Sequence, residues 1–135
     1  MSNSKSIDIK HVLCCDAVRI ENSGKEMLLG VYHSTIVMKE LPESLQGLNF
    51  RMESKVHANI DSDFTCALVG PKNDIAGQIS GRLKVGVKGE GGDGLMHIPI
   101  SPINFSHSGT HRLRFSLDKE RPRTVFEIDV RLPKL

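Results

Sequence analysis

Apolar and polar residues alternate with a period of two along several parts of the chain. Within residues 50–60, every second position from Phe50 onward is apolar apart from Ser54, and the positions between them carry charged or polar side chains. Since successive side chains of a strand point to opposite faces of its sheet, this alternation predicts a half-buried antiparallel strand with one face in solvent. The pattern recurs in residues 83–87, 113–117 and 126–132. These runs predict an all-β fold.

Turn-forming residues separate the predicted strands at fairly regular intervals. Residues 21–25 predict a hairpin turn in which Gly24 adopts a positive φ, and residues 61–63, 70–74 and 118–123 predict further connections. We therefore expect one antiparallel β-sandwich domain of about seven to nine strands. It spans residues 1–135, and residues 1–6 are expected to be flexible.

Two stretches depart from simple alternation. Residues 41–47 contain Pro42 and Gly47 at positions where they could open and close a single helical turn, and we expect at most this one short helical element. Residues 27–38 are apolar on both faces at their start. That composition fits either a central strand covered on both sides or a strand that bends at Gly30 and changes sheet, and we favour the buried strand.

Composition narrows the class of protein without naming an activity. The chain holds 18 Lys+Arg against 16 Asp+Glu, a formal net charge of +2, and 39% hydrophobic residues, which is typical of a globular domain. No run approaches the roughly 18 apolar residues of a membrane span. Residues 1–5 lack the apolar segment of a secretory signal. The cysteines, Cys14, Cys15 and Cys66, are odd in number, which favours free thiols in the cytoplasm.

The first predicted hairpin carries a distinctive pattern. A strand ends near the acidic Asp16, a turn closes with Gly24-Lys25, and Leu28-Leu29-Gly30-Val31-Tyr32 follows. Together with the Leu41-Pro42 connection and residues 105–115, this hairpin resembles a small uncharacterised family of bacterial and phage-associated proteins, a domain of unknown function. The resemblance implies a β-sandwich and supplies no activity, cofactor or functional residue.

A glycine-rich segment formally matches the GxGxxG pattern of dinucleotide-binding proteins. That pattern binds pyrophosphate where it opens a helix, whereas residues 95–100 contain Pro99 and strand-forming side chains. We therefore expect a hairpin loop, which could serve as a recognition element because loops on a rigid sandwich commonly carry binding. The candidate loop consists of Gly89, Glu90, Gly91, Gly92, Asp93 and Gly94.

Two histidines offer the main argument for catalysis. His107 and His111 have an HxxxH spacing, but Gly109 lies between them and a predicted strand begins at Thr110, so their rings need not converge on a metal. His11 and Cys15 share one strand face at a separation of about 13 Å, too far for proton transfer. A small metal-dependent or hydrolytic enzyme that uses His107 and His111 is thus the alternative hypothesis, and no cofactor or metal is predicted.

Four arginines near the C-terminus form a candidate basic face for nucleic acid. Acidic residues interleave with them, which favours a solvated strand face with ion pairs over a phosphate-binding surface. Aromatic residues make up 4% of the chain and there is no Trp, so stacking platforms for sugars or single-stranded nucleic acid are not expected. Weak nucleic-acid binding is therefore ranked third among the hypotheses, and nucleic acid is not the expected partner. It would use Arg112, Arg114, Arg121 and Arg123.

The leading functional hypothesis is a non-catalytic binding or assembly module. A sandwich leaves edge strands whose backbone groups can pair with another chain. We expect a protein partner or self-association through sheet edges or loops, and no membrane association. The sequence does not specify a small-molecule ligand.

Overall fold

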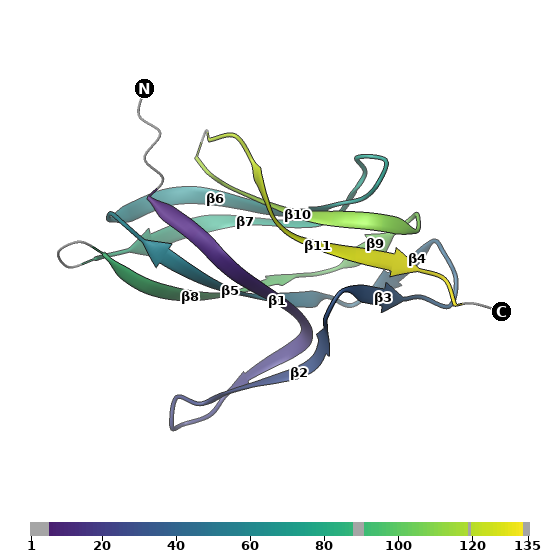
Figure 1. Cartoon of the computed structure of the whole chain (residues 1–135), viewed down its shortest axis with the longest axis horizontal. Helices are drawn as coiled ribbons and strands as arrows, with labels where there is room; N and C mark the ends of the chain where they lie inside the picture. Colours follow the sequence, from purple (N-terminus) through teal and green to yellow (C-terminus); the bar gives the residue numbers. More distant parts are fainter. Residues whose placement is uncertain (1–5, 88–90, 119, 134–135) are drawn as a thin grey trace.

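Figure 1 shows a computed structural model of the chain, which describes residues 6–87, 91–118 and 120–133. The described residues form strands and no helix, so the predicted all-β class is confirmed. The first sheet has the strand order β2-β1-β5-β8 and the second has the order β3-β11-β10-β6-β7; β4 and β9 form a separate pair. The first sheet comprises β1 (Ile7–Ile20), β2 (Glu26–Tyr32), β5 (Leu48–Val56) and β8 (Gly92–Ile100).

The second sheet contains the C-terminal strands. It comprises β3 (Thr35–Val37), β6 (Ile60–Val69), β7 (Ile75–Val85), β10 (Gly109–Leu117) and β11 (Arg123–Arg131). The remaining pair comprises β4 (Glu43–Leu45) and β9 (Ile103–Phe105). Eleven strands thus form in the described part of the chain, where about seven to nine were expected. The extra strands include β3, β4 and β9, which have three residues each and are too short to produce a recognisable alternation.

The two sheets lie face to face around one apolar core (Figure 1). In β5, Phe50, Met52 and Val56 are buried while Arg51 and Glu53 point away from the core, as the alternation predicted. Leu113, Phe115 and Leu117 of β10 fill the core from the second sheet. Ser54 is also buried and its hydroxyl has no hydrogen-bond partner, an exception in a core where polar groups are normally paired.

The expectation of a purely antiparallel fold is wrong at one position. β3 pairs with β11 in parallel, with Thr35 opposite Asp129 and Val37 opposite Arg131. The chain leaves β2 in the first sheet and enters β3 in the second, so it reaches the edge beside β11 by crossing between layers rather than by a hairpin. The other strand pairs of the described residues are antiparallel.

The prediction of a buried strand at residues 27–38 is also wrong. β2 is an edge strand, and Gly30 has a φ of 67°, which bends the chain before it changes sheet at β3. The second of the two alternatives therefore holds. The apolar run predicted burial, but the side chains of Met27 and Leu29 remain exposed in the structure.

Two predicted connections are strands instead. Residues 43–45, expected in a helical turn, form β4 and pair with β9, and the Leu41–Pro42 peptide is cis. The predicted turn at residues 61–63 lies inside β6, and the chain turns at residues 57–59. Asp61 and Asp63 both point outward from β6. Arg82 of β7 pairs with both, through Nε at 3.0 Å from Asp61 Oδ1 and through Nη1 at 3.3 Å from Asp63 Oδ1. The hairpin turn at Gly24 is confirmed by its φ of 87°.

The expected flexibility of residues 1–6 concerns a segment of which only Ser6 is described; its carbonyl accepts a hydrogen bond from the His57 N–H at 2.8 Å. The described residues contain no helix that is long and apolar enough to cross a membrane.

Candidate functional site

The outward face of the first sheet carries a row of side chains that runs across three strands. The register places Leu13 of β1 opposite Arg51 of β5, and Arg51 opposite His97 of β8. Residues directly opposite each other in a sheet share a face, and the neighbours of Arg51, Phe50 and Met52, are buried in the core. The three side chains of this row therefore point away from the core.

The adjacent row on the same face adds a carboxylate and a second histidine. The register places His11 opposite Glu53, which is in turn opposite Leu95. Arg51 donates a hydrogen bond from Nη1 to Glu53 Oε2 at 2.6 Å, and Glu53 Oε2 lies 3.5 Å from His11 Nδ1. These contacts join neighbouring positions within one sheet.

The contact that closes the network comes from β2. Glu26 Oε1 accepts a hydrogen bond from Arg51 Nε at 2.5 Å, and its Oε2 lies 2.8 Å from His97 Nε2. In a flat sheet β2 and β8 would lie three strand spacings apart, about 14 Å. Residues 16–32, which we call the hairpin arm, must therefore fold back over the outward face, as β2 does beneath the first sheet in Figure 1.

The bend of the hairpin arm lies where β1 and β2 meet at Asp16 and Gly30. Tyr32 Oη donates a hydrogen bond to Asp16 Oδ1 at 2.8 Å, and Asn49 Nδ2 donates one to the Asp16 carbonyl at 3.0 Å. A Cβ atom at Gly30 would lie 2.3 Å from Asp16 Oδ2. Gly30 is therefore required twice, for its positive φ and for the space that the Asp16 carboxylate occupies.

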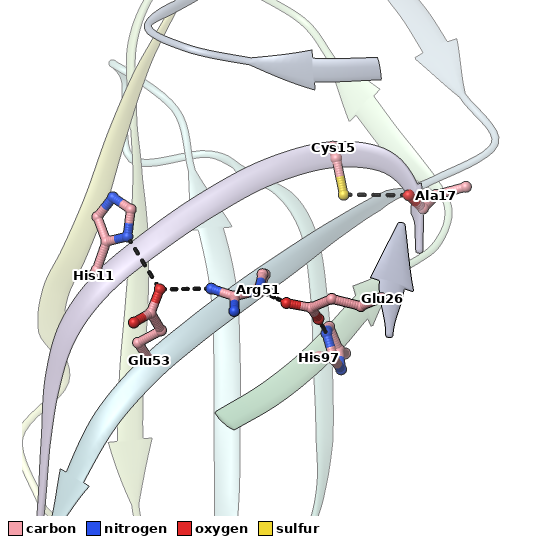
Figure 2. A network of polar contacts seen from close by, with 7 residues as sticks. All are labelled: His11, Cys15, Ala17, Glu26, Arg51, Glu53 and His97. Carbon is pink, nitrogen blue, oxygen red and sulfur yellow. Dashed lines mark hydrogen bonds and ion pairs between the residues drawn. The ribbon is translucent and has the colours of Figure 1, made fainter. Parts of the chain in front are cut away.

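Figure 2 shows the five side chains in one line, His11, Glu53, Arg51, Glu26 and His97, which we call the polar clasp. Its centre is partly shielded from water, since the side chains of Arg51, Glu26 and His97 are 17%, 22% and 27% exposed. Hydrogen bonds from Arg51 and His97 lower the pKa of Glu26, and hydrogen bonds from Arg51 and His11 lower the pKa of Glu53. Both carboxylates are therefore held in their charged form.

Cys15 lies beside the polar clasp without joining it. The register places it opposite Asn49 on the outward face, yet it is fully buried, and its thiol donates to the Ala17 carbonyl at 3.5 Å (Figure 2). Burial raises the pKa of the Cys15 thiol, and the charges of Asp16 and Glu26 raise it further. A thiol in this setting is a poor nucleophile.

The hydrogen bonds and ion pairs of the polar clasp are suited to hold strands together rather than to transfer protons. A general base needs a free lone pair and a pKa near the working pH, whereas both oxygens of Glu26 are engaged and its pKa is lowered. The Glu26 carboxylate instead holds the hairpin arm on β5 and β8. Sequence analysis missed this cluster because Glu26 and His97 are separated by 71 positions.

The two histidines with HxxxH spacing do not form a site. His111 is fully buried, with Nδ1 3.0 Å from the Gly109 carbonyl and its ring edge-on to Phe105 at 5.1 Å. His107 Nδ1 lies instead 3.8 Å from Asp74 Oδ1. A search of the described residues finds no group of three or more His, Cys, Asp or Glu that could hold a metal ion.

The four C-terminal arginines do not share one face. Arg112 and Arg114 alternate with core residues and point outward from β10, whereas Arg121 is exposed in the connection that follows. Arg123 lies opposite Phe115 and its Nη2 donates a hydrogen bond to the Ile7 carbonyl of the first sheet at 3.0 Å. Arg123 therefore bridges the two sheets and does not lie on the outward face with Arg112 and Arg114.

The predicted glycine loop is shorter than expected. Gly92, Asp93 and Gly94 belong to β8 and pair with β5, and Asp93 lies 3.6 Å from the Lys55 ammonium. Gly91 precedes the strand with a φ of 103°. Gly89 and Glu90 lie outside the described residues.

A hollow of about 450 Å³ lies beside the bend of the hairpin arm. Asp16 and Asn49 line it together with residues 45–48 and 99–101. Asp16 is its only titratable lining residue, and the carboxylate already accepts the hydrogen bond from Tyr32. Its other polar lining residues are Gln46, Asn49 and Ser101.

Comparison with known proteins places the chain in a family but assigns it no activity. A search of the curated proteins gives no match. A family model described as a family of unknown function, DUF6941, matches residues 10–131, a range that includes both sheets apart from the first three residues of β1, and every residue of the polar clasp. The chain therefore belongs to this family of unknown function, DUF6941.

Proposed function

We propose that the protein is a non-catalytic interaction module that binds an extended segment of a partner protein at the open edge of β2. The observation that carries this proposal is the character of that edge. Among the described residues β2 pairs with β1 alone, and the strand contains no Lys, Arg or Pro. Natural edge strands usually carry such residues to prevent pairing with other chains, so an edge without them is suited to accept a strand.

The backbone of β2 has hydrogen-bonding groups free on its outer side. The Glu21 N–H donates to the Lys25 carbonyl at 2.8 Å, which makes this a hydrogen-bonded pair. Because such pairs alternate in an antiparallel ladder, Met27, Leu29 and Val31 bond to β1. The N–H and C=O groups of Leu28 consequently face the open edge.

Exposed apolar side chains indicate the kind of segment that fits. Met27 and Leu29 are 41% and 42% exposed and lie on the same face of β2. A partner strand with apolar side chains at alternate positions would cover them, since opposite residues of paired strands contact each other. The partner we propose is therefore an extended, alternately apolar segment of another protein, with a second copy of this chain as the other possible outcome.

The other sheet edges are less suited to this role. β8 contains Pro99, β7 carries Arg82 and Lys84 near its end, and β3 has three residues. Each of these features is a recognised means of blocking edge-to-edge pairing. The comparison supports β2 as the docking edge.

A proline substitution at Leu28 tests the proposal. Leu28→Pro removes the N–H on the open edge and leaves the hydrogen bonds between β1 and β2 in place, whereas the control Leu28→Ala keeps the N–H and shortens the side chain. Tagged forms of the protein are used to isolate binding proteins from cell extract, and the affinity of the purified partner is then measured. We expect Leu28→Pro to weaken binding by about tenfold or more and Leu28→Ala to weaken it less. Equal binding by both variants would contradict docking at this edge.

We also propose a cytoplasmic location, which the three free and buried cysteines support because free thiols are typical of a reducing compartment. A bacterial or phage-associated origin is proposed from the pattern of the first hairpin.

A further inference from the structure

The geometry points to Glu26 as a latch: its carboxylate, held by Arg51 and His97, keeps the hairpin arm closed over the outward face of the first sheet, and the arm opens at the bend beside Gly30 when this hold is lost. The inference concerns a movement of the chain itself. It stands whether or not β2 binds a partner.

The first step is that the polar clasp joins the hairpin arm to strands that are not its neighbours. β2 lies beside β1 and has no comparable backbone contact with another strand among the described residues. Glu26 nevertheless reaches Arg51 on β5 and His97 on β8, and each oxygen of the carboxylate has its own partner. Charge-assisted hydrogen bonds of this kind are about twice as strong as neutral ones.

The second step is that apolar packing of the hairpin arm is incomplete. Val18 and Leu28, on the face that carries Glu26, are half-buried, whereas Ile20, Met27 and Leu29 remain exposed. Side chains that stay accessible to water gain little from the closed arrangement, since hydrophobic stabilisation scales with the apolar area removed from water. The two hydrogen bonds of Glu26 therefore add to closure where apolar burial is only partial.

The third step is that the bend can act as a hinge. Gly30 has a positive φ and no side chain, so its backbone can change conformation at little cost. The hydrogen bond from Tyr32 to Asp16 lies at this bend, and Tyr32 is paired with Cys14 of β1, so Tyr32 stays with the sheet when the arm turns about the bend. Opening therefore requires a change of backbone conformation at Asp16 in β1 and at Gly30 in β2.

Cys15 provides a natural reporter for this movement. It is fully buried on a face that no second sheet covers, and the Glu26 charge acts on its thiol. Opening of the hairpin arm would admit a thiol reagent to Cys15. Cys66, buried in the core between the sheets, would stay protected until the whole domain unfolds.

The test compares thiol labelling rates at neutral pH in a Cys14→Ala background, with Cys15 and Cys66 separated by peptide mass spectrometry. Glu26→Ala removes the latch, and Glu53→Ala is the matched control, because Glu53 pairs with the same Arg51 but belongs to β5 rather than to the arm. We expect Glu26→Ala to accelerate Cys15 labelling by about tenfold or more relative to Cys66, and Glu53→Ala to change that ratio by less than about twofold.

An unchanged ratio in Glu26→Ala, or an equal increase in Glu53→Ala, would overturn the latch. The unmodified Glu26 in the Cys14→Ala background keeps the test decisive if Glu26→Ala does not fold. We expect Cys15 to be labelled through a local opening, faster than Cys66. Equal labelling rates for the two thiols, limited by global unfolding, would also overturn the inference.

Discussion

At the scale of single residues, the hairpin arm depends on a small number of positions whose role is steric or electrostatic. Gly30 accepts a positive φ and leaves room for the Asp16 carboxylate, and Tyr32 donates a hydrogen bond to that carboxylate. The pattern Leu28-Leu29-Gly30-Val31-Tyr32, recognisable in the sequence, thus has a physical explanation as the bend of the arm. The sequence also indicated that Gly30 could bend a strand, but the position of Asp16 against it depends on a contact across two strands.

Alanine substitutions at three glycines separate the two requirements. We expect Gly30→Ala to lower the free energy of unfolding by about 2–3 kcal/mol, because it combines a strained φ with a clash against Asp16. Gly24→Ala, with a φ of 87° but nothing within 4 Å of the new Cβ, should cost about 1 kcal/mol. Gly86→Ala has neither problem and should lie within about 0.5 kcal/mol of the unmodified chain. Urea denaturation measures the series, and a Gly30→Ala cost no larger than that of Gly24→Ala would show that the Asp16 contact is unimportant.

At the scale of elements, the polar clasp couples β2 to β5 and β8 through groups whose charge depends on pH. The pKa values of Glu26 and Glu53 are lowered in the folded chain, chiefly by hydrogen bonds from Arg51. An unfolded glutamate titrates near pH 4.3. A group with a lowered folded-state pKa stabilises the fold above its unfolded value, and this contribution is lost as the pH falls through the folded-state pKa.

We therefore expect Glu26→Gln to lower the free energy of unfolding at pH 7, and the difference from the unmodified chain to shrink as the pH falls below about 4.3. Denaturation curves collected between pH 3 and pH 7 measure this difference. Glu21→Gln is the control, because Glu21 is an exposed carboxylate of the same hairpin with no ion pair recorded in the described structure. It should stay within about 0.5 kcal/mol at both ends of the range. A Glu26→Gln difference that is constant with pH would argue against the hydrogen-bonded carboxylate.

The elements also show which parts of the structure can be predicted from the sequence. Long alternating strands such as β5 and β10 are evident from their own residues, because each faces the core on one side and solvent on the other. β2 was misjudged because an exposed edge strand with apolar residues has the same composition as a buried one. The polar clasp was missed because it joins three strands that are distant in sequence, and its members also fit the outward, solvated faces of ordinary strands.

At the scale of the whole molecule, two sheets enclose one apolar core, and the hairpin arm lies outside that core (Figure 1). The catalytic and nucleic-acid hypotheses relied on residues that the fold separates: His111 is buried beside Phe105, and Arg123 bridges the sheets. The hairpin arm instead combines an open strand edge, exposed apolar side chains and the hydrogen bonds of Glu26 to β5 and β8. These features favour an element that presents itself to another chain.

Hydrogen exchange of the complex tests the proposed docking edge most directly. The protein is measured alone and with the partner obtained by affinity isolation, and exchange is followed by mass spectrometry. We expect binding to protect the amide of Leu28, whose N–H faces the open edge of β2, and to leave the edges at β7 and β8 unchanged. Protection confined to another edge or to the outward face of the second sheet, with β2 unaffected, would contradict it.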